Sequence, residues 1–408
     1  MRRLFCYSKY NVRLLTEREM KMDKPFWTPW NMEQLFRSPR IDPSDVTAAS
    51  GIRSVFYEGL PYKGKETRIF AHYGIPEAAE GEKVPAVVLV HGGGGTAYEE
   101  WVQLWMKRGY AAIAMDLEGN VPDKSEGGTK RIGHAMPGPA REGIFLDCDE
   151  PVQDQWMFHA AAACIRAHSF LRSLPQVDLE RIGITGISWG GIVTSLVAGL
   201  DSRFAFAIPV YGCGYLYEAH NQWGERFVEM GASGAESVKR QTEPSAYFSR
   251  VTMPTLWVNW LYDPHFGMNI FSKSYRHAKK GIEQSGLCIY PQLGHSHPLG
   301  WKPDEIYAFA DSIVRDGSRL LRLGEPTEHN GTAAVSYDSA DGHEPVQAEL
   351  LYTRNCDNWQ QCEWITADCT IDPSDRRVHT PLPQDAKAFF FNVRDTRGLT
   401  ASTPVLVR

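Results

Sequence analysis

A serine flanked by glycines near the middle of the chain could act as a nucleophile. The segment Gly186-Ile187-Ser188-Trp189-Gly190 follows the apolar run 182–184 and precedes the small, apolar stretch 191–198. This pattern predicts a strand, a sharp turn and a helix, in which the glycines avoid collisions with neighbouring backbone. Ser188 would then be exposed at the apex of the turn. The alternative is that Ser188 only caps the following helix, since serine is a good N-cap residue.

A glycine-rich segment earlier in the chain could stabilise a developing negative charge. His91-Gly92-Gly93-Gly94-Gly95 follows the apolar run 84–90. Consecutive glycines let backbone N–H groups approach a substrate oxygen, so we expect an oxyanion hole formed by Gly93 or Gly94 together with the N–H of Trp189. A flexible turn and a phosphate-binding loop are the alternatives. No Gly-Lys-Ser/Thr follows the glycines, which disfavours phosphate binding.

A nucleophilic serine needs a histidine to accept its proton and a carboxylate to orient that histidine. Asp263 follows the predicted strand 253–259, and His295 follows the predicted strand 287–290, in the order serine, acid, histidine. His297 is the alternative base, but it lies just before Pro298 and the last helix, so we favour His295. For Asp263 the structural alternative is an Asp-Pro turn.

The same part of the sequence also allows a metal site. His295, His297, Asp263 and His265 together resemble the ligand set of a hydrolytic zinc site. A metal site would leave the serine turn and the glycine-rich segment unexplained. We therefore favour the triad over a metal site.

Aromatic residues near these segments could contact the substrate. Tyr215 and Trp223 lie in the long connection 213–250, and Trp260 and Tyr262 precede the acid. We expect all four to line the substrate site, with Tyr215 and Trp223, together with Tyr217, offering an aromatic surface to a sugar or an aryl group. Packing within the connection explains Tyr215 and Trp223 equally well.

Short, nearly continuous apolar runs predict strands that are buried on both faces of a parallel sheet. These runs cover 84–90, 110–115, 181–185, 204–210, 253–259 and 287–290. Together with a hairpin over 55–60 and 66–73, they predict a mostly parallel eight-stranded α/β sheet. Helices are expected to flank the sheet, among them 155–172 and 303–314.

Shifts in composition divide the chain into three predicted parts. We expect residues 1–50 to form an arm and residues 51–322 to form an α/β catalytic domain. In residues 330–408 apolar and polar residues alternate, which predicts a small all-β sandwich. Two connections, about 119–153 and 213–250, are longer than ordinary crossovers. We expect them to lie over the mouth of the sheet as a cap or lid.

The bulk composition limits the partners of this protein. The 408 residues are 43% hydrophobic and 23% charged, with a net charge of −6. The chain therefore lacks the excess of basic residues that is typical of nucleic-acid binding. No apolar run has the length of a membrane span, and Tyr7, Ser8 and Lys9 interrupt any secretory signal. We expect a cytoplasmic protein without a nucleic-acid or membrane partner.

Several segments resemble a known superfamily. The segments VPAVVLVHGGGGTAYEEWVQLWMKRGYAAIAMD, RIGITGISWGGIVTS, VYGCGYL and DEIYAFADS are similar to α/β-hydrolases over roughly residues 55–315. Within this superfamily, their sequences resemble a bacterial group described as acetyl xylan esterase-like or dienelactone-hydrolase-like. The segments AELLYT and FFFNVRDTRGLTAS also resemble the β-sandwich that is appended in this group.

The resemblance implies a serine carboxylesterase that acts on short acyl esters, such as acetyl groups on plant polysaccharide, without a cofactor. It assigns the triad to Ser188, Asp263 and His295. One departure is Trp260-Leu261-Tyr262 before the acid, where the group has a small, polar turn. Bulk at this position would narrow the acyl pocket or change the substrate. Two rival functions remain: a peptidase or a lactone or xenobiotic-ester hydrolase of the same fold, and an inactive hydrolase domain that serves carbohydrate binding.

Overall fold

The computed structural model describes residues 27–123 and 130–408. Its centre is a nine-stranded sheet with the order β1-β2-β3-β5-β4-β8-β9-β10-β11. The six apolar runs form the parallel part of this sheet. These strands are β4 (Val84–Val90), β5 (Ala111–Met115), β8 (Val177–Ile187), β9 (Phe206–Val210), β10 (Leu256–Trp260) and β11 (Gly286–Tyr290). The predicted fold class is confirmed.

The other side of the sheet is antiparallel. The predicted hairpin consists of β2 (Ile52–Glu58) and β3 (Arg68–Gly74), and β3 pairs with β5. A further short strand, β1 (Ile41–Pro43), pairs with β2, so the sheet has nine strands instead of the predicted eight. Three residues are too few to show an alternating pattern in the sequence.

The segment before β1 packs on the sheet's helical layer. It contains α1 (Met32–Leu35), and the Trp30 indole N–H donates a hydrogen bond to the backbone oxygen of Phe158 at 2.9 Å. The two rings stack with centroids 5.3 Å apart. Residues 1–26 of the predicted arm lie outside the described residues.

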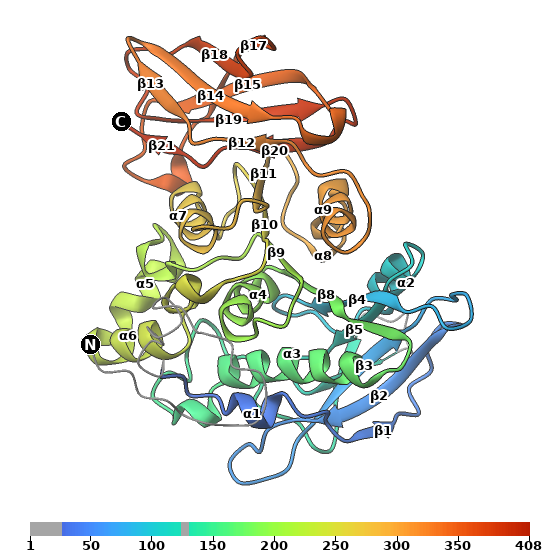
Figure 1. Ribbon diagram of the computed structural model, residues 1–408. Coiled ribbons are helices and arrows are strands. Elements are labelled where there is room, and N and C mark those ends of the chain that lie inside the picture. Colours follow the sequence, from blue (N-terminus) through green and yellow to red (C-terminus); the bar gives the residue numbers. More distant parts are fainter. Residues whose placement is uncertain (1–26, 124–129) are drawn as a thin grey trace, which may run out of the picture.

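Helices cover both faces of the sheet (Figure 1). One face carries α3 (Trp156–Ser173), α4 (Trp189–Leu200) and α7 (Met268–Ala278), and the other carries α2 (Glu99–Met106) and α9 (Asp304–Val314). Trp105 of α2 contacts Tyr307 of α9, with ring centroids 4.9 Å apart. This double cover explains why the parallel strands are almost continuously apolar. Within the described ranges, no helix is both long and apolar enough to cross a membrane.

The two long connections meet each other beyond the sheet. The first contains β6 (Asn120–Asp123) and β7 (Lys130–Gly133), which form a hairpin whose residues 124–129 lie outside the described residues. The second contains α5 (Gln222–Glu229) and α6 (Gly231–Gln241). Arg226 of α5 donates hydrogen bonds to the backbone oxygens of Ile144 and Phe145, at 3.0 and 3.2 Å. Short 3-10 turns complete these connections and occupy Val152–Asp154, Leu216–Glu218, Pro244–Ala246 and Phe248–Arg250.

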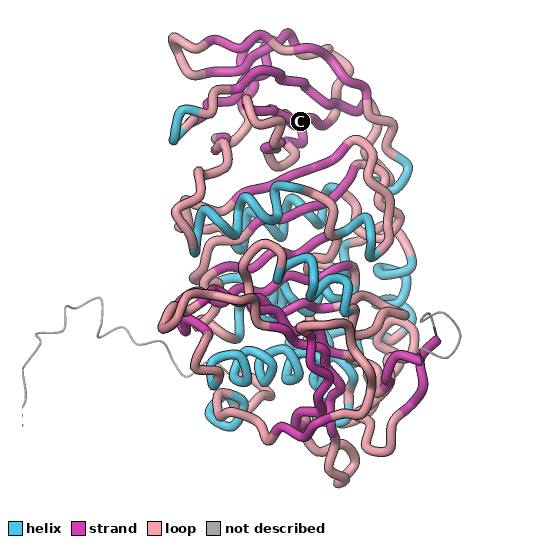
Figure 2. Tube along the Cα trace, turned by 90° about the vertical axis from the view of Figure 1, so that its right-hand side faces the viewer, coloured by secondary structure: helices cyan, strands magenta, loops and turns pink. Residues whose placement is uncertain are grey.

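The C-terminal residues form two antiparallel sheets that lie at one end of the molecule, beside β11 (Figures 1 and 2). The first contains β12 (Arg322–Leu323), β14 (Thr332–Asp338), β18 (Arg377–Pro381) and β17 (Thr370–Asp372), with β13 (Thr327–His329) paired to β14. The second contains β16 (Ile365–Asp368), β15 (Pro345–Thr353), β19 (Ala388–Asp395) and β20 (Thr400–Ser402), with β21 (Leu406–Val407) paired to β19. Two 3-10 turns, Ala340–Gly342 and Trp359–Gln361, lie in their loops.

Strand β19 is buried on both faces, which explains its run of three phenylalanines. Phe389 and Phe391 face the core between the two C-terminal sheets, whereas Phe390 packs with the core of the large sheet. The contact between the two parts is also polar. Ile289 of β11 donates its N–H to Ser402 Oγ at 2.8 Å and accepts a hydrogen bond from Asn392 Nδ2 at 2.9 Å.

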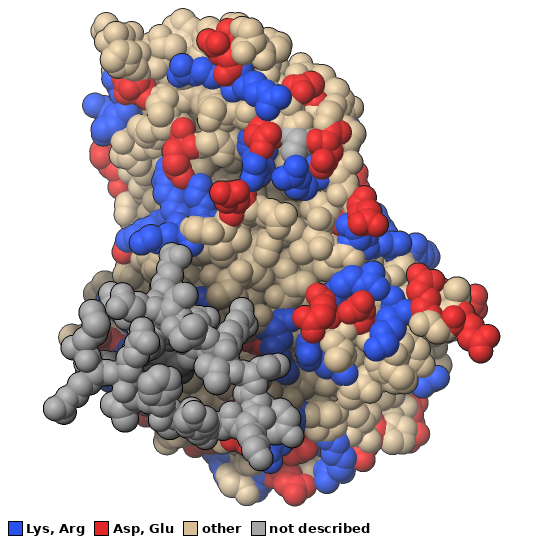
Figure 3. Space-filling model, in the orientation of Figure 1, with Lys and Arg blue, Asp and Glu red and all other residues tan. Residues whose placement is uncertain are grey.

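Acidic and basic side chains are interspersed on the face of the molecule that Figure 3 shows. This distribution agrees with the modest net charge of −6. It differs from the continuous basic surface that is typical of nucleic-acid binding.

Candidate active site

Ser188 occupies a strained turn between β8 and α4. Its φ of +58° and ψ of −118° are rarely adopted by residues other than glycine. The close packing of the neighbouring glycines keeps the turn sharp: a Cβ on Gly186 would lie 2.2 Å from the backbone oxygen of Gly190, and one on Gly190 would lie 2.0 Å from that of Val90. Ser188 makes no side-chain capping hydrogen bond within the described residues, so the helix-cap alternative does not apply.

The structure brings the three predicted triad residues together. The Ser188 Oγ lies 2.9 Å from His295 Nε2, and His295 Nδ1 lies 2.7 Å from Asp263 Oδ2. All three residues leave the carboxyl ends of parallel strands, Ser188 after β8, Asp263 after β10 and His295 after β11. Because a carboxylate only accepts hydrogen bonds, Nδ1 carries the imidazole proton and Nε2 is free to accept the serine hydroxyl.

Asp263 is enclosed by hydrogen-bond donors. Its exposed fraction is 2%, and its Oδ1 accepts the backbone N–H groups of His265 and Phe266, both at 2.9 Å. The indole N–H of Trp260 donates to Oδ2 at 3.0 Å. Trp260, which the sequence suggested as a substrate contact, therefore bonds to the acid itself. These donors fix the orientation of the carboxylate toward His295.

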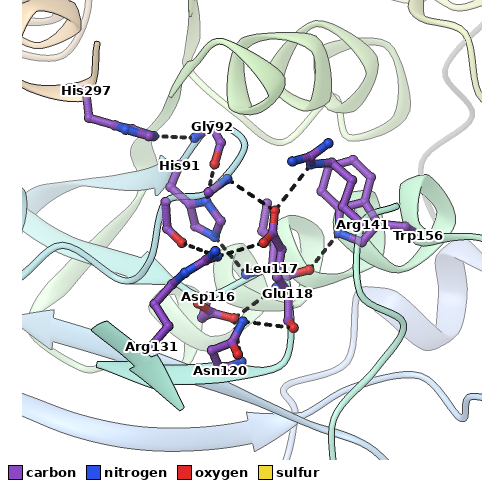
Figure 4. Close-up of polar contacts among 12 residues, drawn as sticks. His91, Gly92, Asp116, Leu117, Glu118, Asn120, Arg131, Arg141, Trp156 and His297 are labelled. Atoms are coloured by element: carbon purple, nitrogen blue, oxygen red, sulfur yellow. Dashed lines mark hydrogen bonds and ion pairs between the residues drawn. The ribbon is translucent and has the colours of Figure 1, made fainter. Parts of the chain in front are cut away.

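His297 points toward the glycine-rich segment. It begins α8 (His297–Gly300), and its Nε2 accepts the Gly92 N–H at 2.8 Å (Figure 4). Its Nδ1 lies 3.2 Å from the Tyr98 hydroxyl. Burial, with the neighbouring His91 and His295, lowers the pKa of His297 to about 3. His297 is therefore a neutral acceptor for the glycine-rich segment, while His295 faces Ser188.

The glycine-rich segment passes directly beside the serine. A Cβ on Gly92 would lie 2.9 Å from the Ser188 Cβ, so only glycine allows this approach. Gly94 has a φ of +70°, and its N–H is directed to Glu118 Oε1 at 3.5 Å. The Gly93 N–H makes no hydrogen bond within the described residues. As the first residue of α4, Trp189 has no intrahelical acceptor for its N–H. The backbone N–H groups of Gly93 and Trp189 are therefore the two donors beside Ser188 that remain available to bind an oxyanion.

Buried aromatic rings form a wall next to the nucleophile. The Trp189 ring lies 4.8 Å from Trp223, 5.7 Å from Phe145 and 5.2 Å from Trp156, between centroids. The exposed fraction of each ring-bearing residue is 8% or less. Trp223 thus lies beside the site as the sequence suggested, and Phe145 and Trp156 join it. A wall of this kind restricts the space for long substituents.

The other two predicted substrate contacts lie farther from the triad. The Tyr215 hydroxyl is 2.8 Å from His277 Nδ1, on α7. Tyr262 is 50% exposed, and its ring centroid is 6.4 Å from that of Trp260. No direct contact joins either side chain to Ser188 or His295 within the described residues.

Sequence reasoning missed the rings that surround His295. Tyr211, His265 and Phe266 have ring centroids 4.4, 4.7 and 6.3 Å from that of His295. Tyr211 directly follows β9, so its position at the carboxyl end of a parallel strand was an available signal. Its hydroxyl donates to the backbone oxygen of Ser296, which holds the histidine loop.

The alternative metal site is not formed. His297 is bonded to Gly92, and His265 Nδ1 lies 2.7 Å from Gln222 Nε2. Among residues 27–123 and 130–408, no group of three or more His, Cys, Asp or Glu side chains is arranged to hold a metal ion. The four candidate ligands do not converge, because His295 and His297 point in different directions.

Two family models and one curated relative match parts of this chain. The family model described as acetyl xylan esterase matches residues 21–223, and that of the prolyl oligopeptidase family matches residues 150–311. An acetyl esterase from Xylanibacter ruminicola, Axe7A, is 28% identical over 144 residues, which cover 35% of this chain and 32% of that protein. The chain therefore matches about a third of the length of this curated relative.

Solved structures share the fold at low sequence identity. The acetyl xylan esterase from Paenibacillus sp. R4 aligns with a TM-score of 0.51 and 22% identity, covering 69% of this chain and 92% of that one. Acetyl xylan esterase 1 from Thermoanaerobacterium sp. JW/SL YS485 aligns with a TM-score of 0.50 and 18% identity, covering 74% of this chain and 99% of that one.

Proposed function

Because the chain is an α/β-hydrolase of the acetyl xylan esterase-like group, we propose that it is a serine carboxylesterase that removes short acyl groups, above all acetyl, from a carbohydrate. The observation that carries this proposal is the continuous hydrogen-bond chain from Ser188 Oγ through His295 to Asp263, with distances of 2.9 and 2.7 Å. Such a chain is the arrangement that activates a serine hydroxyl.

The proposed reaction has two steps. His295 Nε2 accepts the hydroxyl proton as Ser188 Oγ attacks the ester carbonyl carbon, and the resulting tetrahedral intermediate expels the alcohol, which takes the proton back from His295. Water then attacks the acyl-enzyme with the same histidine as base, and the acid leaves Ser188. Asp263 stabilises the imidazolium that forms in each step. The N–H groups that donate to its carboxylate keep it aligned with His295.

The oxyanion would be held by the backbone N–H groups of Gly93 and Trp189. These two donors flank Ser188 and have no competing protein acceptor in the described residues, so they can bind the negative oxygen as it develops. The aromatic wall of Trp189, Trp223 and Phe145 supports a preference for small acyl groups. A long acyl chain would have to displace these buried rings.

Hydrolysis of p-nitrophenyl acetate by the purified protein tests the reaction type. Ser188→Ala should lower kcat/KM by a factor of about 10⁴ or more, because the nucleophile is lost while the fold is kept. A serine-directed phosphonate should label the wild type and leave Ser188→Ala unlabelled. Activity that survives the substitution would refute the proposal.

Two substrate series test the finer claims. Among p-nitrophenyl esters, kcat/KM should fall by about tenfold or more from acetate to hexanoate, and Trp223→Ala should reduce this difference by removing part of the wall. Hydrolysis of acetylated xylan, feruloylated glycans and methyl-esterified glycans should be compared to test which glycan ester is the substrate. An absence of glycan deacetylation together with fast p-nitrophenyl acetate hydrolysis would leave a serine esterase with another substrate.

A peptidase is the second candidate, because the prolyl oligopeptidase family model matches residues 150–311. The same triad could attack an amide, whose leaving amine needs protonation by His295. Acyl-amino acid p-nitroanilides distinguish the two reactions. A kcat/KM for the anilide that equals or exceeds that for the matched ester would favour the peptidase.

A further inference from the structure

A basic side chain lies directly on the candidate oxyanion hole. A Cβ on Gly93 would lie 2.8 Å from Arg141 Nη2 and 2.9 Å from Trp189 Cδ1. The guanidinium carbon of Arg141 is 5.2 Å from the centroid of the Trp189 ring. Arg141 therefore touches both residues whose N–H groups face the substrate, although it belongs to the connection between β7 and α3.

Neighbouring groups hold the guanidinium in a fixed orientation. Arg141 Nε donates to Glu118 Oε1 at 3.3 Å (Figure 4). Its Nη1 donates to the backbone oxygen of Gly143 at 3.0 Å. Nη2 has no acceptor among the described residues, and it is the nitrogen that lies against Gly93. The Arg141 side chain is 20% exposed, so it is largely enclosed by the protein and still partly open to solvent.

Glu118 lies between Arg141 and a second arginine, Arg131. Glu118 accepts hydrogen bonds from both Arg141 and Arg131, the latter at 2.7 Å. Burial favours the neutral acid, but the hydrogen bond from Arg131 and the nearby positive charges outweigh it and lower the pKa of Glu118. One carboxylate thus bonds to two guanidinium groups and balances at most one of their charges. The buried Asp116, whose Oδ1 accepts the Glu118 N–H at 2.9 Å, lies next to the same cluster.

A second unused donor lies next to the same tryptophan. Trp223 packs on Trp189, is only 3% exposed, and its indole N–H is buried without a partner among the described residues. Buried donors are normally satisfied, so this N–H calls for an acceptor from a ligand or a water molecule. A guanidinium with a free N–H group is well suited to bind a carboxylate.

We propose that Arg141 forms an anion subsite beside Ser188, and that the preferred substrates are esters that carry a carboxylate on the same molecule. The subsite rests on the proposed esterase function, since it selects among the substrates of that site. The carboxylate binds at Arg141 Nη2, while the ester carbonyl lies over the Gly93 and Trp189 N–H groups. Arg141 is thus a specificity-determining residue.

Two matched acetate esters test the subsite. Phenyl acetate is neutral, and 4-acetoxybenzoate adds one carboxylate to the same ring. Arg141→Gln should lower the kcat/KM ratio of the anionic to the neutral ester by about tenfold, mainly through KM, because one charge-assisted hydrogen bond is lost. Arg141→Lys should retain part of the preference. Added salt should reduce the wild-type ratio, because ions screen the attraction between the guanidinium and the carboxylate.

Arg131→Gln is the matched control. It removes the same charge from the same Glu118, but Arg131 bonds to the backbone oxygen of Gly95 instead of contacting Gly93 or Trp189. The ester ratio should therefore change by about threefold or less, as expected for a screened charge without direct contact. An unchanged ratio in Arg141→Gln, or an equal loss in Arg131→Gln, would overturn the subsite.

Equilibrium binding separates this proposal from the esterase function. Calorimetric titration with benzoate should show binding to the wild type, with affinity about tenfold weaker in Arg141→Gln, while phenol binding stays the same. If the wild type hydrolyses neither ester but benzoate behaves in this way, the esterase proposal fails and the subsite stands. If both esters are hydrolysed and benzoate binds equally to both proteins, the subsite fails alone.

Discussion

The two histidines of the segment Gly294-His295-Ser296-His297 should respond very differently to substitution. His297→Leu removes the acceptor for the Gly92 N–H, which it binds at 2.8 Å in a buried position. An unsatisfied buried N–H costs about 1–3 kcal/mol. If displacement of the glycine-rich segment adds this whole free energy to the activation barrier, kcat/KM falls by about 5- to 150-fold.

His295→Ala should be far more damaging, because it removes the only histidine that contacts Ser188 Oγ in the described part of the chain. Loss of a triad histidine lowers turnover by about 10⁴-fold or more. The two variants should therefore differ by about two orders of magnitude in kcat/KM for p-nitrophenyl acetate. Labelling with a serine-directed phosphonate would report the fraction of intact sites.

His297→Gln is the matched control for the hydrogen bond. Its side-chain oxygen can accept the Gly92 N–H, so it should recover most of the activity that His297→Leu loses. Equal losses in His297→Gln and His297→Leu would refute the acceptor role. A loss in His297→Leu as large as that in His295→Ala would refute the assignment of the base.

Three further perturbations follow from the same geometry. Burial lowers the pKa of His297 to about 3, so the stability that this group contributes is complete above the unfolded pKa of about 6.5 and is lost as the pH falls toward 3. The melting temperature should therefore depend less on pH between about 6.5 and 4 in His297→Gln than in the wild type. Parallel plots of melting temperature against pH for the two proteins would contradict this. Trp260→Phe removes one donor from Asp263 and should lower kcat by about 3- to 30-fold with little change in KM; an effect confined to KM would instead indicate a substrate contact. Gly190→Ala places a Cβ 2.0 Å from the backbone oxygen of Val90 and should cost several kcal/mol in the free energy of unfolding, about 3 or more, in chemical denaturation; a stability equal to wild type would show that the turn can relax.

The sequence predicted the parallel strands well because both faces of each strand are covered. Burial on two sides makes a run such as Val84–Val90 uniformly apolar, and the short length of the run favours a strand over a helix. The short strand Ile41–Pro43 was not predicted, because its formation depends on pairing with β2 and not on a pattern in its own residues. Local patterns report burial, but pairing at an edge is a tertiary property.

The proximity of Ser188, Asp263 and His295 was also predictable, since parallel strands end at the same edge of the sheet. The direction of each side chain was not. Trp260 precedes the acid in sequence, yet only the fold shows that its N–H reaches the Asp263 carboxylate. Arg141 lies in a long connection without periodicity, so nothing in the sequence placed it on Gly93.

The hydrogen bonds that join Ile289 to Asn392 and Ser402 have a consequence for the integrity of the nine-stranded sheet. Strand β11 is the last of the nine, and its outer side would otherwise offer unpaired backbone groups to another chain. The C-terminal sheets cover this edge with side chains instead of extending the ladder. Because the loop that carries His295 leaves the end of β11, cutting the chain before Arg322 would expose an aggregation-prone edge on the strand that positions this histidine.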